Sequence, residues 1–167
     1  MHNLKIPFYK LLMFLLIFIS GSIAHASEDH RQQVSKLVEA TEEPFGIVFE
    51  IVSGDKNHLD WAVPETQHLI SQLREKFPEL DIAVVTHGAE QFALQKKNLK
   101  DNPDLKNKVQ SLVGKGVDLH VCGTLAGWRG VNDSEFSSLV DVSTTGPAQI
   151  NDYINLGYEK IVIRKIN

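Results

Sequence analysis

The sequence predicts an α/β domain in which a parallel, five-stranded sheet is covered by helices on both faces. Short, nearly continuous apolar runs of strand-forming residues alternate along the chain with stretches of helical periodicity. Strands buried on both faces have such runs, and strands that alternate with helices form parallel sheets. One of these strands, residues 117–122, ends at the only cysteine of the chain, Cys122.

The first residues are expected not to belong to this fold. Two lysines precede an apolar run at residues 11–19, and a stretch of small residues then closes on Ala24-His25-Ala26. This order is typical of a secretory signal peptide. The apolar run is much shorter than the roughly 20 residues of a membrane-spanning helix. We therefore expect residues 1–26 to be a signal peptide and the mature protein to be periplasmic, with no membrane attachment after cleavage.

The remaining residues, 27–167, have the length of one domain. We find no internal repeat and no low-complexity linker in them. The chain carries a net charge of −4, which gives no reason to expect a nucleic acid as partner. A single cysteine excludes an internal disulfide, and in an exported protein it indicates a reactive thiol, an intermolecular pair or a buried side chain. No motif points to a cofactor.

The first half of the domain contains two predicted strands. After a polar leading helix within residues 27–43, the run at residues 45–52 (Phe-Gly-Ile-Val-Phe-Glu-Ile-Val) predicts a buried strand. Glycine and polar residues break it. Apolar residues at helical spacing then predict a helix up to Phe77, which Pro78 ends. Residues 81–86 form the second buried strand, and His87-Gly88 follows at its carboxyl end.

The second half contributes three more strands. A short helical piece at residues 89–95 runs into a lysine-rich turn, and Asn102-Pro103 opens a helix that ends at residues 114–116. The strand ending at Cys122 comes next, followed by a glycine-rich loop at residues 124–131. A capping-box pattern then predicts one short helical turn at residues 132–135. The last three elements are a strand at residues 140–143, a helix opened by Pro147 and a strand at residues 160–166.

Several pieces of this order resemble the DsrE/DsrF-like sulfur-relay family. They are residues 49–55 (Phe-Glu-Ile-Val-Ser-Gly-Asp), 84–88 (Val-Val-Thr-His-Gly), 116–122 (Gly-Val-Asp-Leu-His-Val-Cys) and the closing block 140–158. The resemblance implies a three-layer α/β/α sandwich that assembles as a homotrimer or homohexamer. It also implies a cysteine in the position of Cys122 that carries sulfane sulfur as a persulfide, with a sulfur donor or acceptor as partner. The signal peptide and Gly123 depart from the pattern of many relatives.

Cys122, His87 and Arg129 are the candidate site residues. Ligands and chemistry collect at the carboxyl ends of strands in open α/β sheets, and Cys122 and His87 both lie at such ends. Sulfur chemistry needs a thiolate, which main-chain amides and a nearby cation favour. We therefore expect Cys122 to accept sulfur, His87 to tune it or move its proton, and Arg129 to be the cation if the following loop folds back. Trp128 and Leu125 would limit access of water.

Two alternatives remain open. Cys122 is equally well explained as a small buried side chain, since free cysteines are among the most buried residues. The protein would then be a non-catalytic, oligomeric binder of a small ligand on the same fold. A metal site is the remaining alternative, because His120 and Cys122 share a strand face and His87 lies on another strand end. Whether the protein is an enzyme or a persulfide carrier without turnover is also left open.

Overall fold

Residues 29–165 are described by the computed structural model, and their elements follow the predicted alternation. The strands are β1 (Ile47–Ile51), β2 (Ile82–Thr86), β3 (Val117–Cys122), β4 (Asp141–Ser143) and β5 (Glu159–Ile163). The α-helices are α1 (His30–Glu39), α2 (Leu59–Lys76), α3 (Lys96–Asp101), α4 (Pro103–Val113), α5 (Gly123–Trp128) and α6 (Gly146–Asn155). Two 3-10 helices are η2 (Ala89–Leu94) and η3 (Asp133–Glu135).

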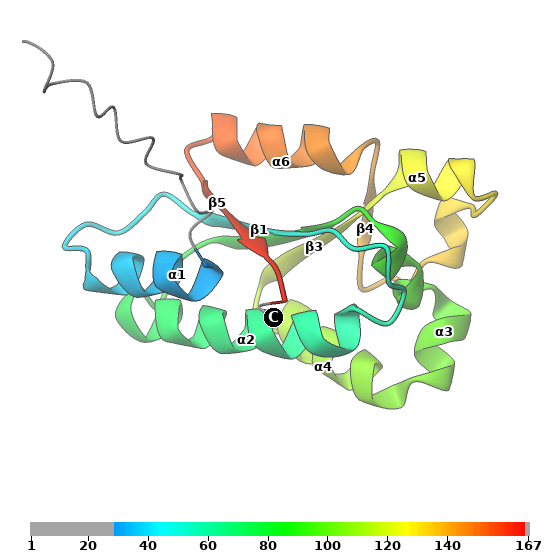
Figure 1. Cartoon of the computed structure of the whole chain (residues 1–167), viewed down its shortest axis with the longest axis horizontal. Helices are drawn as coiled ribbons and strands as arrows, with labels where there is room; N and C mark the ends of the chain where they lie inside the picture. Colours follow the sequence, from blue (N-terminus) through cyan, green and yellow to red (C-terminus); the bar gives the residue numbers. More distant parts are fainter. Residues whose placement is uncertain (1–28, 166–167) are drawn as a thin grey trace, which may run out of the picture.

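The elements form three layers (Figure 1). The middle layer is one sheet in which every neighbouring pair is parallel, in the order β4-β3-β2-β1-β5. Helices α1, α2 and α4 cover one face, while α5 and α6 lie on the other. The predicted α/β/α sandwich with a five-stranded parallel sheet is confirmed. The predicted signal peptide lies outside the described residues.

Alternation along the strands divides the core between the two faces. Ile47, Phe49 and Ile51 belong to the larger apolar cluster, which includes the buried residues of α2 and α4. Val48 belongs to the smaller cluster, which contains Tyr153 of α6. Because both faces of β1 meet helices, almost the whole strand is apolar, as its sequence predicted. None of the helices in residues 29–165 has the length and apolar character that crossing a membrane requires.

Helix boundaries follow the capping residues. The Asn102 side chain accepts a hydrogen bond from the Leu105 N–H at the start of α4, and Thr145 does the same for Ala148 in α6. Gly157 follows α6 with a φ of +95°, a left-handed conformation that glycine adopts without strain.

Two predicted irregular segments are helical instead. The lysine-rich turn after residue 95 is α3, which buries Leu99 in the larger cluster. The first half of the glycine-rich loop is α5, which buries Ala126. In α5 the packing of Ala126 on the core outweighs the low helix propensity of two glycines, whereas the lysines and leucine of α3 are themselves good helix formers.

Candidate functional site

The candidate site lies where β2 and β3 end. These strands are neighbours, and their register pairs Thr86 with Val121. His87 directly follows Thr86, and Cys122 directly follows Val121. Both residues therefore lie at the carboxyl edge of the sheet. The sequence analysis required these two strands to lie side by side, and they do. The chemical roles of His87 and Cys122 remain predictions.

Cys122 is both the last residue of β3 and the N-cap of α5. Its Sγ accepts a hydrogen bond from the Leu125 N–H over 3.5 Å. The residue is only 5% exposed. The sulfur thus faces a main-chain donor at the start of α5 and has little contact with solvent.

His87 is held by a carboxylate that the sequence analysis did not select. Its Nε2 lies 2.8 Å from Oε1 of Glu50 on β1. The other Glu50 oxygen accepts from Lys160 Nζ on β5 over 2.9 Å. The hydrogen bond from His87 is the main cause that lowers the pKa of Glu50 to about 2; burial opposes it, and the hydrogen bond and charge of Lys160 lower the pKa further. Glu50 therefore fixes one ring nitrogen of His87 and is ionised at neutral pH.

Helix α6 begins directly against His87. A Cβ atom built on Gly146 would lie 2.4 Å from the His87 Cβ, which is closer than non-bonded carbons approach. Only glycine allows this contact without a shift of the helix or the histidine. The imidazole is thus confined between the start of α6 and Glu50, with 15% of its side chain exposed.

A second polar cluster on the same sheet face involves His120. Its Nε2 lies 2.9 Å from the Tyr153 hydroxyl, and its Nδ1 lies 3.2 Å from the Ser143 hydroxyl. The Tyr153 hydroxyl donates to Asp118 over 3.4 Å. Burial lowers the pKa of His120 despite the nearby acids, and burial together with Asp118 raises the pKa of Tyr153. These bonds anchor α6 to β3.

His120 therefore has partners on both ring nitrogens. Within residues 29–165, no group of three or more His, Cys, Asp or Glu side chains is placed to hold a metal ion.

Arg129 and Trp128 lie on the surface at the end of α5. Trp128 is 80% exposed and does not cover Cys122 in the single chain. The Arg129 main chain closes α5 through bonds to Leu125 and Ala126. In the described part of the chain, no contact joins its guanidinium to Cys122.

A buried carboxylate holds the loops that follow β1 and β2. Glu90 is fully buried and accepts from the Ser53 N–H (2.7 Å), the Gly88 N–H (2.7 Å) and the Thr86 hydroxyl (2.5 Å). The adjacent Gln91 is also fully buried and bonds to the main chain of Cys122. Neither residue had a distinctive signal in the sequence, because a Glu-Gln pair within a short helical piece is equally typical of its solvent-exposed side.

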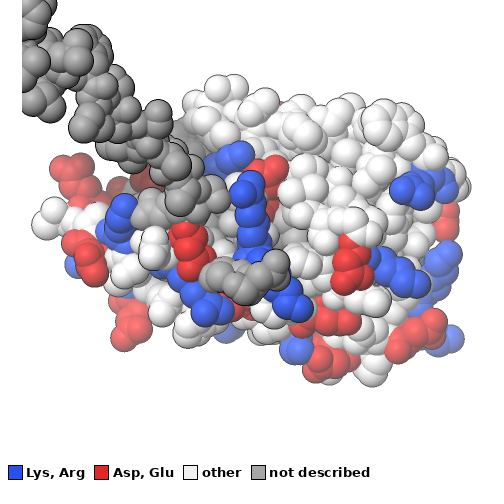
Figure 2. Space-filling view, in the orientation of Figure 1, with Lys and Arg blue, Asp and Glu red and all other residues white. Residues whose placement is uncertain are grey.

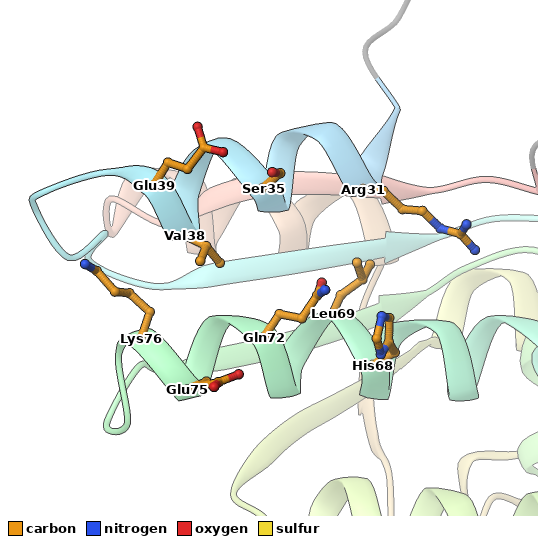
Figure 3. A pocket seen from close by; sticks show the side chains of 9 residues that line it. All are labelled: Arg31, Ser35, Val38, Glu39, His68, Leu69, Gln72, Glu75 and Lys76. Carbon is orange, nitrogen blue, oxygen red and sulfur yellow. The ribbon is translucent and has the colours of Figure 1, made fainter.

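A hollow in the surface lies away from this site. A surface groove of about 590 Å³ runs between α1 and α2, and Figure 3 shows polar side chains from both helices along it. Arg31 at one end forms a two-pronged ion pair with Glu65. The groove lies across the sheet from α5 and α6, so it is separate from the candidate site.

The fold and the site together define a class: small parallel α/β/α domains with a thiol at the carboxyl edge of the sheet, beside a histidine on the next strand. Within this class, the chain belongs to the DsrE/DsrF-like family, whose model matches residues 15–163.

The chain is also similar to solved structures. A protein of unknown function from Methanobacterium thermoautotrophicum is 20% identical with a TM-score of 0.59, over 71% of this chain and 99% of that one. At this identity the likeness shows the fold alone. A conserved protein of unknown function from Bacteroides thetaiotaomicron aligns with 12% identity and a TM-score of 0.49, over 71% of this chain and 95% of that one. No curated protein matches the chain.

Proposed function

We propose that the protein is an exported sulfur carrier that binds sulfane sulfur as a persulfide on Cys122. Membership of the DsrE/DsrF-like family suggests a role of the sulfur-relay type. The observation that carries the proposal is the position of the only thiol, which faces the Leu125 amide at the start of α5 and lies one strand from His87. Residues 1–26 would direct the protein to the periplasm.

The proposed step is a thiol–polysulfide exchange. The Cys122 thiolate attacks one sulfur of a polysulfide, a new S–S bond forms, and the shortened polysulfide leaves with the electron pair of the broken S–S bond. The thiol proton passes to His87, whose ring Glu50 holds in place. Arg129, exposed at the end of α5, would attract the anionic donor. Because Cys122 is nearly buried, the donor must be small or α5 must shift.

Intact mass of the mature protein, before and after polysulfide treatment, tests this proposal. We expect mass increases of whole sulfur atoms that a reductant removes and that Cys122→Ser lacks. His87→Ala should take up sulfur about tenfold or more slowly, because general base assistance is lost. His68→Ala, on the exposed side of α2, is the matched control. If the wild-type thiol does not react with polysulfide, the protein is not a persulfide carrier. If His87→Ala takes up sulfur at the wild-type rate, His87 has no part in the reaction.

Self-association is the second part of the proposal. Several large apolar side chains in residues 29–165 are exposed. Trp128 ends α5, Ile154 and Leu156 lie at the end of α6, and Phe45 and Val52 flank β1. In Figure 2 charged side chains crowd around α1 to α4, whereas the surface over α6 is nearly free of them. A face with few charges that exposes Ile154 and Leu156 supports contact with further copies of the chain, as a homotrimer or homohexamer.

Sedimentation velocity measures this directly. We expect wild type to sediment as three or six chains, and Leu156→Glu, which puts a charge on this face, to yield smaller species. Gln72→Glu, an equally exposed position on α2, should leave the assembly intact. A monomeric wild type would contradict the proposal.

A further inference from the structure

The Gln91 side chain holds both main-chain groups of Cys122. Its Oε1 accepts from the Cys122 N–H over 2.7 Å, and its Nε2 donates to the Cys122 carbonyl oxygen over 3.2 Å. Gln91 is fully buried, and the two residues are 31 positions apart in the chain. A buried amide with two bonds to one distant residue constrains that residue much more than a single contact would.

The end of the β2–β3 pairing creates the place for this amide. The paired residues end with Thr86 and Val121, and after His87 the chain turns into η2. On its other side Cys122 still pairs with Ser143 of β4. Gln91 thus supplies a donor and an acceptor where the neighbouring strand has stopped, and Cys122 keeps an extended conformation with φ −87° and ψ 109°.

That conformation determines where the sulfur lies. Cys122 ends β3 and caps α5, so a rotation of its main chain would carry Sγ away from the Leu125 N–H. We propose that Gln91 is a positioning residue for the Cys122 thiol: its amide fixes the Cys122 main chain so that sulfur faces the amide at the start of α5. This inference rests on the proposed function only in assuming that the thiol reacts.

The pH profile of Cys122 alkylation tests the inference, because it follows the thiolate fraction rather than access alone. The rate of reaction with iodoacetamide is measured across pH for wild type, Gln91→Met and Gln95→Met. Methionine keeps the side-chain length and removes both hydrogen bonds. Gln95 is the matched control, since it is also buried, follows directly after η2 and has its side-chain hydrogen bonds with Glu135 and Asn98.

We expect the midpoint of the profile to move upward in Gln91→Met, with a three- to tenfold smaller reactive fraction at neutral pH, and to stay in place in Gln95→Met. A Gln91→Met profile that coincides with wild type overturns the inference. An equal shift in Gln95→Met also overturns it, because the effect would then be a general loosening of η2. If Gln91→Met does not fold, Gln91→Asn carries the same expectation, since its shorter amide cannot reach both groups.

Alkylation does not depend on sulfur carriage, so the two proposals fail separately. A profile that depends on Gln91 without polysulfide uptake keeps the positioning role and refutes the carrier. Polysulfide uptake together with an alkylation profile that Gln91→Met leaves unchanged supports the carrier and contradicts the positioning role of Gln91.

Discussion

Glu90→Ala should destabilise the protein by about 3–5 kcal/mol, the cost of removing one side of a fully buried hydrogen-bond network. The substitution leaves the Ser53 and Gly88 N–H groups and the Thr86 hydroxyl without their acceptor. It also opens a cavity in a part of the structure that is completely closed to solvent. Both effects act on the loops that follow β1 and β2.

Equilibrium urea unfolding measures this loss. Glu79→Ala is the control, because Glu79 is exposed and its replacement should change the free energy of unfolding by less than about 0.5 kcal/mol. A loss below about 1 kcal/mol in Glu90→Ala would show that the three donors find other partners.

Glu50→Gln should lower stability by about 1–3 kcal/mol at neutral pH, and the difference should disappear in acid. The pKa of Glu50 is about 2 in the folded protein, against a usual value of 4.5. The folded state therefore binds the ionised form better. This contribution is complete above pH 4.5 and is lost as the pH falls toward 2, because the carboxylate is then protonated in both states. Because the Glu50 side chain is partly exposed, we expect the loss of stability to be smaller than the free energy that corresponds to the full pKa difference.

Urea unfolding of wild type and Glu50→Gln at several pH values between neutrality and pH 2 measures the effect. Glu159→Gln, an exposed position on the neighbouring strand β5, should follow wild type throughout. A difference between wild type and Glu50→Gln that does not vary with pH would contradict the ionic role of Glu50.

The sheet could be predicted because each strand that helices cover on both faces must be apolar almost throughout. β1 and β2 are such strands, and their apolar runs locate them within two residues. The bounds of helix α4 could also be predicted, since Asn102 and Pro103 mark its start and Gly114 follows its end. These signals are local, so they need no knowledge of tertiary contacts.

The network around the thiol depends on contacts between distant segments and could not be read in the same way. Gln91 reaches a residue 31 positions away, and nothing distinguishes its amide from that of a solvated glutamine in the sequence. Glu50 does carry a signal in the sequence, since it is the only charged residue of the apolar strand β1. Such a carboxylate needs a partner, and here the partners are His87 and Lys160.

The place of β5 beside β1 delays completion of the fold. Glu50 of β1 and Lys160 of β5 form an ion pair although they are 110 residues apart in the chain. Before α6 and β5 are in place, the edge of β1 that pairs with β5 is open and the sheet face that α6 covers is exposed. Contacts between the two ends of a chain also slow folding, since a long loop must close first. A chain emerging from the ribosome therefore cannot complete the sheet before β5 has been synthesised.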